Sequence, residues 1–285
     1  MIKDFNFNNI KVELPKNIDR DNKGKIEGNF AIISLNRPDQ LNAITQETLI
    51  EIKTFLEKVE FYPEVRCVVL RGTKFFTKKP SFSSGIDLNK FPEPNIKPKK
   101  PYHKLYSTYL LHKYFNFIEK YPKPLIAAID GYAIGGGCEL ALCCDIIIAS
   151  KRSTFGFSEI LRGIFPAGGG TQKNVKNIGL ARTMKMFYFG ELFSAEEMFN
   201  WGYVSYLVND DEFEKYIYDK ANRLANTPTI ALLMIKKFAK LKTDIISDFS
   251  LQLELKNYEK DISSDKNIME LITLFSEKGT EIKNK

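Results

Sequence analysis

Histidine is scarce in this chain of 285 residues, which contains only His103 and His112. Both stand on one predicted helix. With so few histidines, a serine–histidine–acid triad and a histidine-ligated metal site are both poorly supported. We interpret both histidines as surface or packing residues. The sequence predicts no metal site.

Cysteine is also rare, and none of the four cysteines has the CxxC spacing of a redox or zinc motif. Cys143 and Cys144 are adjacent, which is a poor geometry for a mutual bridge. Cys67 and Cys138 likewise stand in apolar stretches. We expect all four to be reduced, buried side chains in a reducing compartment.

Long uninterrupted apolar runs are missing. Residues 1–15 contain charged side chains and no apolar core, so they do not resemble a secretory signal. The longest apolar stretch, residues 126–149, is interrupted by Asp130, Glu139, Asp145 and several glycines, which a membrane span would not tolerate. We therefore expect a soluble, cytoplasmic protein with no membrane partner.

Positive charge is in excess, with a formal net charge of +7 and a pI of about 9.0. A basic balance favours anionic partners such as nucleic acid, an acidic membrane surface or a phosphorylated cofactor. An incidental lysine-rich surface would give the same balance. Hydrophobic residues make up 44% of the chain, enough to bury a substantial core.

The first half of the chain alternates strand and helix patterns, which predicts an α/β fold. Predicted strands cover residues 30–36, 67–71, 125–130 and 145–150. Predicted helices cover residues 45–60, 102–120 and 134–144, and Thr45, with Thr48 or Gln46, can cap the first of them. Residues 91–101 hold four of the twelve prolines and predict an exposed loop.

After Gly170 the strand signals fade and amphipathic helical patterns follow. These predicted helices cover residues 171–178, 181–189, 195–201, 212–225, 230–241 and 246–278. The chain therefore divides into an α/β core at residues 1–205 and a helical appendage at residues 206–285.

Residues 131–139 (GYAIGGGCE) place three glycines between a predicted strand and a predicted helix. Consecutive glycines let a ligand approach the backbone closely. The N–H groups of a first helical turn lack internal partners, so this turn suits a phosphate or a transient oxyanion. The Rossmann and P-loop spacings are both absent. A tight turn packed against another element is the alternative.

Residues 82–88 (FSSGIDL) form a second small-residue turn after a predicted strand. The backbone N–H of Ser84 is a candidate for a second donor to an oxyanion. By itself the stretch is also consistent with an ordinary turn.

Two glutamates, Glu139 and Glu159, each stand beside a glycine-containing turn. Two such carboxylates can share one site and one water for acid–base chemistry. Most glutamates are merely solvated. Glu139, however, lies in an apolar helix start, and a buried glutamate needs a partner or a function.

Together these stretches resemble the crotonase, or enoyl-CoA hydratase/isomerase, superfamily. The motifs are ISLNRPDQLNAIT, which ends at Thr45, and PKPLIAAIDGYAIGGGCELALCCDI at residues 122–146. The resemblance implies a crotonase-type spiral of ββα turns with a C-terminal α-helical domain for oligomerisation and CoA contact. It also implies assembly as a homotrimer or a dimer of trimers.

The resemblance implies a coenzyme A thioester whose carbonyl oxygen sits between the N–H groups of Ser84 and Gly136. Glu139 and Glu159 match the two carboxylates of the hydratase branch. Coenzyme A is then part of the substrate, and no separate cofactor is expected. The FSSGIDL turn is more similar to the dienoyl-CoA isomerase version.

Further positions match substrate-contacting segments of the family. These are Asp39, Gln40, Leu41, Ser83, Ile86, Asp87, Leu88, Ala167, Phe275 and Lys278. Asp39 stands where a lysine is common, and Ala167 replaces a glycine whose N–H orients water. Phe275 and Lys278 match a pair that meets CoA, often from a neighbouring subunit. The loop at residues 91–101 is expected to reshape the acyl pocket.

The leading hypothesis is hydration of a 2-enoyl-CoA to a 3-hydroxyacyl-CoA, with Glu139 activating water and Glu159 protonating the α-carbon. The nearest alternative is a double-bond isomerase, acting on enoyl-CoA or dienoyl-CoA, on the same fold. A more distant alternative is an RNA-binding or scaffold role, which only the basic pI and the lysine-rich loop support. The sequence does not identify the acyl group.

Overall fold

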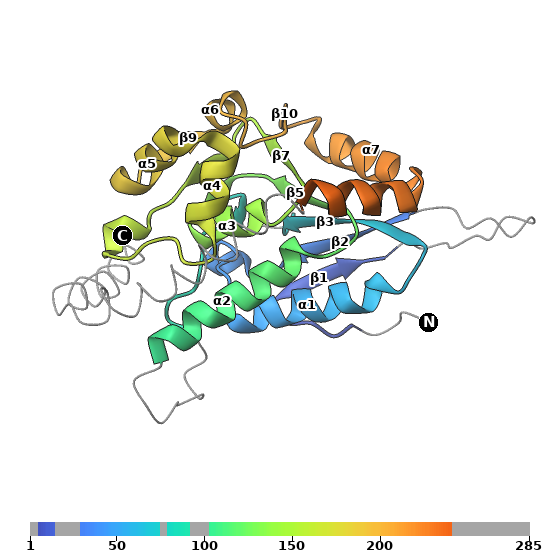
Figure 1. Ribbon diagram of the computed structural model, residues 1–285, viewed down its shortest axis with the longest axis horizontal. Coiled ribbons are helices and arrows are strands. Elements are labelled where there is room, and N and C mark those ends of the chain that lie inside the picture. The colour runs from blue at the N-terminus through green and yellow to red at the C-terminus, as the bar shows by residue number, and fades with distance from the viewer. Residues whose placement is uncertain (1–4, 15–28, 75–78, 92–102, 241–285) are drawn as a thin grey trace, which may run out of the picture.

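The computed structural model describes residues 5–14, 29–74, 79–91 and 103–240, which form two β-sheets and the helices packed on them (Figure 1). Almost all of the predicted loop at 91–101 lies outside these residues. So do the predicted helix at 246–278 and two candidate site residues, Phe275 and Lys278.

The larger sheet has six strands in the order β1-β2-β3-β5-β7-β10. Neighbouring strands are parallel except for the antiparallel pair β1 and β2. Their bounds are Ile10–Glu13, Asn29–Leu35, Val65–Gly72, Leu125–Ile129, Ile146–Ser150 and Tyr206–Val208. The four predicted strands are confirmed as β2, β3, β5 and β7, whose apolar runs are typical of strands covered on both faces.

The smaller sheet has four short strands in the order β4-β6-β8-β9, with β8 and β9 antiparallel. Their bounds are Ser81–Ser83, Tyr132–Ile134, Thr154–Gly156 and Leu192–Ser194. Each of β3, β5 and β7 is followed along the chain by one strand of the smaller sheet. The chain therefore winds as a spiral between two sheets, as the resemblance implied.

The helices lie on both faces of the larger sheet (Figure 1). Their bounds are α1 Gln46–Glu60, α2 His103–Glu119, α3 Gly136–Leu142, α4 Gly170–Ile178, α5 Leu180–Phe189, α6 Ala195–Asn200 and α7 Phe213–Ala225. Short 3-10 turns cover Pro38–Gln40 (η1) and Glu159–Arg162 (η2). Residues 229–240 are also helical. Helix α7 covers one face through Phe213, Ile217 and Ala221.

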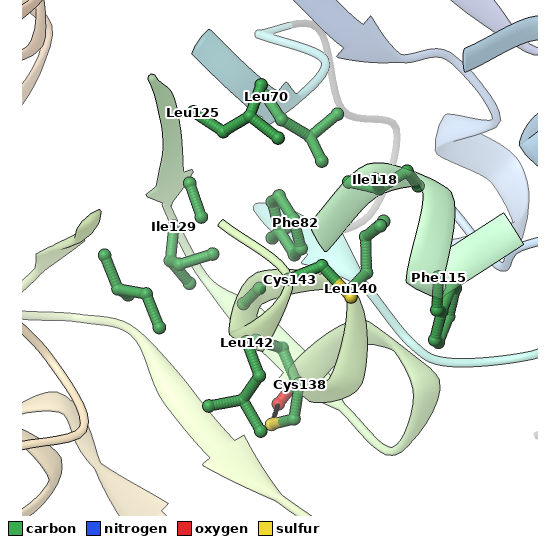
Figure 2. Close-up of a cluster of buried hydrophobic side chains, with 14 of the residues drawn as sticks. Leu70, Phe82, Phe115, Ile118, Leu125, Ile129, Cys138, Leu140, Leu142 and Cys143 are labelled. Carbon is green, nitrogen blue, oxygen red and sulfur yellow. Dashed lines mark hydrogen bonds between the residues drawn. The ribbon is translucent and has the colours of Figure 1, made fainter. Parts of the chain in front are cut away.

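The main core lies on the other face, where α3 is surrounded by apolar side chains (Figure 2). Cys138, Leu140 and Leu142 of α3 and the following Cys143 pack among residues of α2, β3, β4 and β5, which include Leu70, Phe82, Phe115, Ile118, Leu125 and Ile129. This packing fixes α3, and with it the glycine turn that precedes it. Dispersion and burial of apolar area stabilise the arrangement.

Several elements were not predicted from the sequence. Three-residue strands such as β4, β6 and β8 are too short to produce an alternating pattern. Strands β9 and β10 lie in the part for which only helices were predicted. Since β10 pairs with β7, the larger sheet continues past residue 205, the predicted boundary of the α/β core.

The cysteines are all free, and three of them are buried; Cys144 is only half-buried. Within the ranges that the structure describes, no helix is long and apolar enough to cross a membrane.

Candidate active site

Two turns that are far apart in sequence meet at the start of α3. Gly135 precedes α3 with a φ of 52°, in the left-handed region that favours glycine. A β-carbon on Gly136 would lie 2.7 Å from Cγ1 of Ile86 and 3.2 Å from its backbone nitrogen. The glycine turn of residues 131–139 therefore packs directly against the FSSGIDL turn, and only glycine permits this approach.

The meeting of the two turns leaves two backbone donors free. Ile44 donates its N–H to the Gly85 carbonyl and accepts the Asp87 N–H, so these groups point toward Ile44. The N–H of Ile86 between them has no partner among the described residues, and neither has the N–H of Gly136. Two unpaired donors close together suit an oxyanion.

Ser84, the donor predicted from the sequence, has a different role here. Its N–H donates to the Leu41 carbonyl at 2.9 Å, and its hydroxyl donates to the Gln40 carbonyl at 3.1 Å. These bonds join the turn to the loop after η1 and leave the Ser84 N–H occupied. The donor next to Gly136 is therefore that of Ile86, because Leu41, from a distant part of the sequence, has already taken the Ser84 N–H.

Glu139 lies in the first turn of α3 with 2% of its surface exposed. Its Oε1 accepts the N–H of Gly168 at 2.7 Å and that of Gly170 at 2.8 Å. Burial raises the pKa of this carboxyl group, and the two N–H bonds and the positive charge of Lys173 oppose that rise. The carboxylate is thus held in a fixed orientation by backbone donors.

Glu159 begins η2, where its own backbone N–H and the positive charge of Arg162 favour its carboxylate less than burial disfavours it. Its Oε2 is buried without a hydrogen-bond partner among the described residues. A β-carbon on Gly135 would lie 2.7 Å from its Oε1, so the carboxyl group lies against the same glycine turn as Glu139. Burial, followed by the negative charge of Glu139, raises the pKa of Glu159 to about 8. Burial and the neighbouring charge therefore favour the protonated form of Glu159 near neutral pH.

Several other predicted substrate residues lie beside this pair of turns. Asp39 and Gln40 are exposed in η1, and Leu41 follows with a φ of 50°. Leu88 is 50% exposed after the FSSGIDL turn. Ala167 is partly exposed next to Gly168. All five positions are accessible or partly accessible, as contact with a ligand requires.

Ser83 and Asp87 instead make internal contacts that hold the turn. Ser83 is fully buried, and its hydroxyl accepts the Gly85 N–H at 3.1 Å. Asp87 forms an ion pair with Arg37 at 2.9 Å, and both side chains are nearly buried. The two side chains therefore hold the turn that contains Ile86 in place.

Sequence reasoning missed the two donors to Glu139, Gly168 and Gly170. Their signal was present as a glycine run at the start of a predicted helix. It also missed Lys173, which is buried one turn further along α4. Over the residues that the structure describes, no three His, Cys, Asp or Glu side chains gather as a metal site would require.

Known proteins resemble this chain in sequence and in fold. Residues 25–284 match the family model described as enoyl-CoA hydratase/isomerase. A short-chain-enoyl-CoA hydratase from Clostridium acetobutylicum is 30% identical over 88% of this chain and 93% of its own length. A crotonyl-CoA hydratase from Syntrophomonas wolfei is 31% identical over 80% and 85% of the two chains. The crystal structure of an enoyl-CoA hydratase from Bacillus anthracis superposes with a TM-score of 0.71 at 28% identity, covering 95% of this chain and 97% of the other.

Proposed function

Since the chain belongs to the enoyl-CoA hydratase/isomerase (crotonase) family, whose members act on acyl-CoA thioesters, we propose that it hydrates a 2-enoyl-CoA to a 3-hydroxyacyl-CoA. The observation that supports this most directly is the pair of carboxyl groups, Glu139 and Glu159, which lie at one glycine turn beside two N–H groups that have no partner among the described residues. Water addition needs one base, one acid and a place for the enolate oxygen, and this turn offers all three.

The thioester oxygen would lie between the N–H groups of Ile86 and Gly136. Negative charge develops on this oxygen as the enolate forms, so both hydrogen bonds strengthen in the transition state. One such donor contributes about 3–4 kcal/mol to lowering a barrier. Both donors are backbone groups held by the packing of the two turns, so little reorganisation is needed.

The two glutamates divide the proton transfers. Glu139 takes a proton from water, whose oxygen bonds to the β-carbon of the substrate. The electron pair of the double bond moves toward the thioester, and the α-carbon takes a proton from Glu159. The unequal environments suit these roles, because Glu139 has two N–H donors that favour its carboxylate whereas the raised pKa of Glu159 keeps it protonated.

Binding of the CoA part is proposed to involve residues outside the reacting centre. These are Asp39, Gln40, Leu41, Phe275 and Lys278, whereas Leu88 is proposed to contact the substrate and Ala167 to orient the water through its backbone N–H. We also propose a homotrimer or a dimer of trimers in the cytoplasm. No cofactor beyond the substrate's own coenzyme A enters the proposed reaction.

The proposed function is tested with crotonyl-CoA in H₂¹⁸O, since relatives of this chain include a crotonyl-CoA hydratase. The wild type is expected to place ¹⁸O in 3-hydroxybutyryl-CoA. E139Q and E159Q should each lower kcat by about 10²–10⁴-fold. Binding of the CoA ester should change little, because neither carboxyl group is assigned to hold it.

Near-wild-type hydration by either variant would contradict the assignment of that glutamate. A shifted double bond with no ¹⁸O in the product would identify the chain as an isomerase of the same fold. A panel of enoyl-CoA esters of different chain length, branching and ring content would then identify the preferred acyl group.

A further inference from the structure

Lys173 of α4 is a buried lysine that no step of the proposed reaction uses. Its ammonium group forms an ion pair with Glu119 of α2 at 2.9 Å and donates to the Cys143 sulfur at 3.2 Å. Only 10% of the Lys173 side chain is exposed. A buried ammonium is unfavourable without a partner, so its position depends on Glu119.

Lys173 and the donors to Glu139 belong to one short piece of structure. Gly170, which donates to the Glu139 carboxylate, is the first residue of α4. Lys173 donates its backbone N–H to the Gly169 carbonyl at 3.0 Å, within the same turn. Any displacement of this turn would move the N–H groups that orient Glu139.

The partners of Lys173 lead back to Glu139 by a second route. The Cys143 thiol, which accepts a hydrogen bond from Lys173, lies 3.2 Å from the backbone carbonyl of Glu139 and donates to it. The ion pair therefore joins α2, α3 and α4 around the catalytic carboxylate.

Helix α2 also contacts this turn directly. A β-carbon on Gly168 would lie 2.5 Å from two ring atoms of Phe115, one turn before Glu119 on α2. Phe115 is fully buried in the main core (Figure 2). The aromatic ring and the ion pair thus hold the segment from Gly168 to Lys173 against α2.

The charges that face Glu139 come from several elements. Lys173 of α4 attracts its carboxylate, and the carboxyl group of Glu159 in η2, whose pKa the charge of Glu139 raises, lies on the same glycine turn. Cys138 of α3 and Tyr203 also lie near it, and burial raises the pKa of the Cys138 thiol to about 12 and that of the Tyr203 hydroxyl well above its usual value. Both therefore remain neutral near pH 7.

The groups that face Lys173 are Glu119, Cys143 and His112. Burial raises the pKa of the Cys143 thiol to about 11, so the thiol is neutral near pH 7. Burial and the charge of Lys173 lower the pKa of His112 to about 4, so this ring is neutral as well. Lys173 remains the charged group that lowers the pKa of Glu139 within the described part of the chain.

We propose that Lys173 is a positioning residue for Glu139, which holds the first turn of α4 in place through its ion pair with Glu119 and favours the ionised carboxylate through its charge. This inference rests on the proposed role of Glu139 as the base that activates water. Helices α2 and α4, through Glu119 and Lys173, would thus both fix the position of the Glu139 carboxyl group and supply a positive charge near it.

The test compares four variants by stability and by the pH profile of hydration. K173M leaves Glu119 without its partner. E119M/K173M replaces the pair by apolar side chains of similar length, which commonly preserves or raises stability. K173R retains the charge. K176M removes an exposed lysine from the same helix as a matched control.

We expect K173M and E119M/K173M to lower kcat by up to about 10²-fold, the size of effect that follows a small misplacement of a catalytic group. In both, the acidic limb of kcat/KM should move to higher pH, because the Glu139 carboxylate loses a favourable charge. K173R should restore the position of the acidic limb, and K176M should resemble the wild type.

A folded E119M/K173M variant with a wild-type pH profile and kcat would overturn the proposal and leave the ion pair a purely structural role. If K173M fails to fold, the double variant alone decides between these outcomes. If the wild type shows no hydration at all, the proposed function fails instead, and the two failures are thereby distinguished.

Discussion

The two glutamates of the site have the same side chain in two different surroundings. Glu139 accepts two backbone N–H groups and faces Lys173. Glu159 has a buried oxygen with no hydrogen-bond partner in the described part of the chain, and it faces the charge of Glu139. Two nearby carboxyl groups do not both ionise easily in a buried site. The negative charge of Glu139 therefore favours the protonated form of Glu159 near neutral pH.

Glu159 should also make the stability of the fold depend on pH. Its pKa rises from an ordinary value of 4.5 to about 8 on folding. Between these values the unfolded chain has lost a proton that the folded chain keeps, so the free energy of unfolding falls as the pH rises through this window. E159Q is neutral at every pH and should escape this loss.

We therefore expect the melting temperature of E159Q, relative to that of the wild type, to rise from pH 5 to pH 8. Thermal unfolding followed by circular dichroism at several pH values would measure it. A difference that stays constant over this range would show that Glu159 is ionised in the folded protein at neutral pH.

At the scale of elements, α1 illustrates a helix whose start is determined by local chemistry. Thr45 accepts the Thr48 N–H at 3.1 Å, and the Thr48 hydroxyl accepts the Thr45 N–H at 3.2 Å. The predicted cap is thus confirmed with Thr48 as the partner. This helix start immediately follows Ile44, which fixes the peptide groups on either side of the Ile86 N–H.

Replacing Thr45 by alanine should remove the cap and lower the free energy of unfolding by about 1 kcal/mol. T45S retains the hydroxyl and should remain close to the wild type. Urea unfolding of both variants would measure the difference. Equal stability of T45A and T45S would indicate that packing alone fixes the start of α1.

At the scale of the whole molecule, Asp145 joins the C-terminal part of the described chain to the core. Its carboxylate accepts the Leu125 N–H at 2.8 Å and pairs with Lys236 at 2.6 Å and Lys240 at 3.1 Å. Lys240 also donates to the Glu119 carbonyl at 2.7 Å. The helix at residues 229–240 is therefore attached beside the residue that pairs with Lys173.

D145N should weaken this attachment, because an amide keeps the shape of the side chain but loses the charge that two lysines share. We expect the free energy of unfolding to fall by about 2 kcal/mol, as for hydrogen bonds to charged groups. Amide hydrogen exchange should become faster in residues 229–240 than in β3 or β5. D219N, on the exposed side of α7, is a control. Unchanged exchange in 229–240 would show that its apolar contacts alone hold the helix.

The sequence by itself determined those strands, helices and turns that a pattern of neighbouring residues predicts. The strands β2, β3, β5 and β7 follow from continuous apolar runs, and helices such as α1 and α4 follow from apolar residues at helical spacing. The glycine turn before α3 and the two glutamates were also evident, because glycine runs and a carboxyl group in an apolar stretch are unusual wherever they occur.

Tertiary structure decided which groups of the site are free to react. Leu41 takes the Ser84 N–H, and the Ile86 N–H has no partner among the residues that the structure describes. Glu119 and Lys173, from two different helices, meet behind Glu139. Short strands such as β4 and β6 exist because their neighbours supply the hydrogen bonds. The physical reason is the same in each case. Hydrogen-bond partners and burial come from residues far away in the chain, and a local sequence pattern does not show which residues these are.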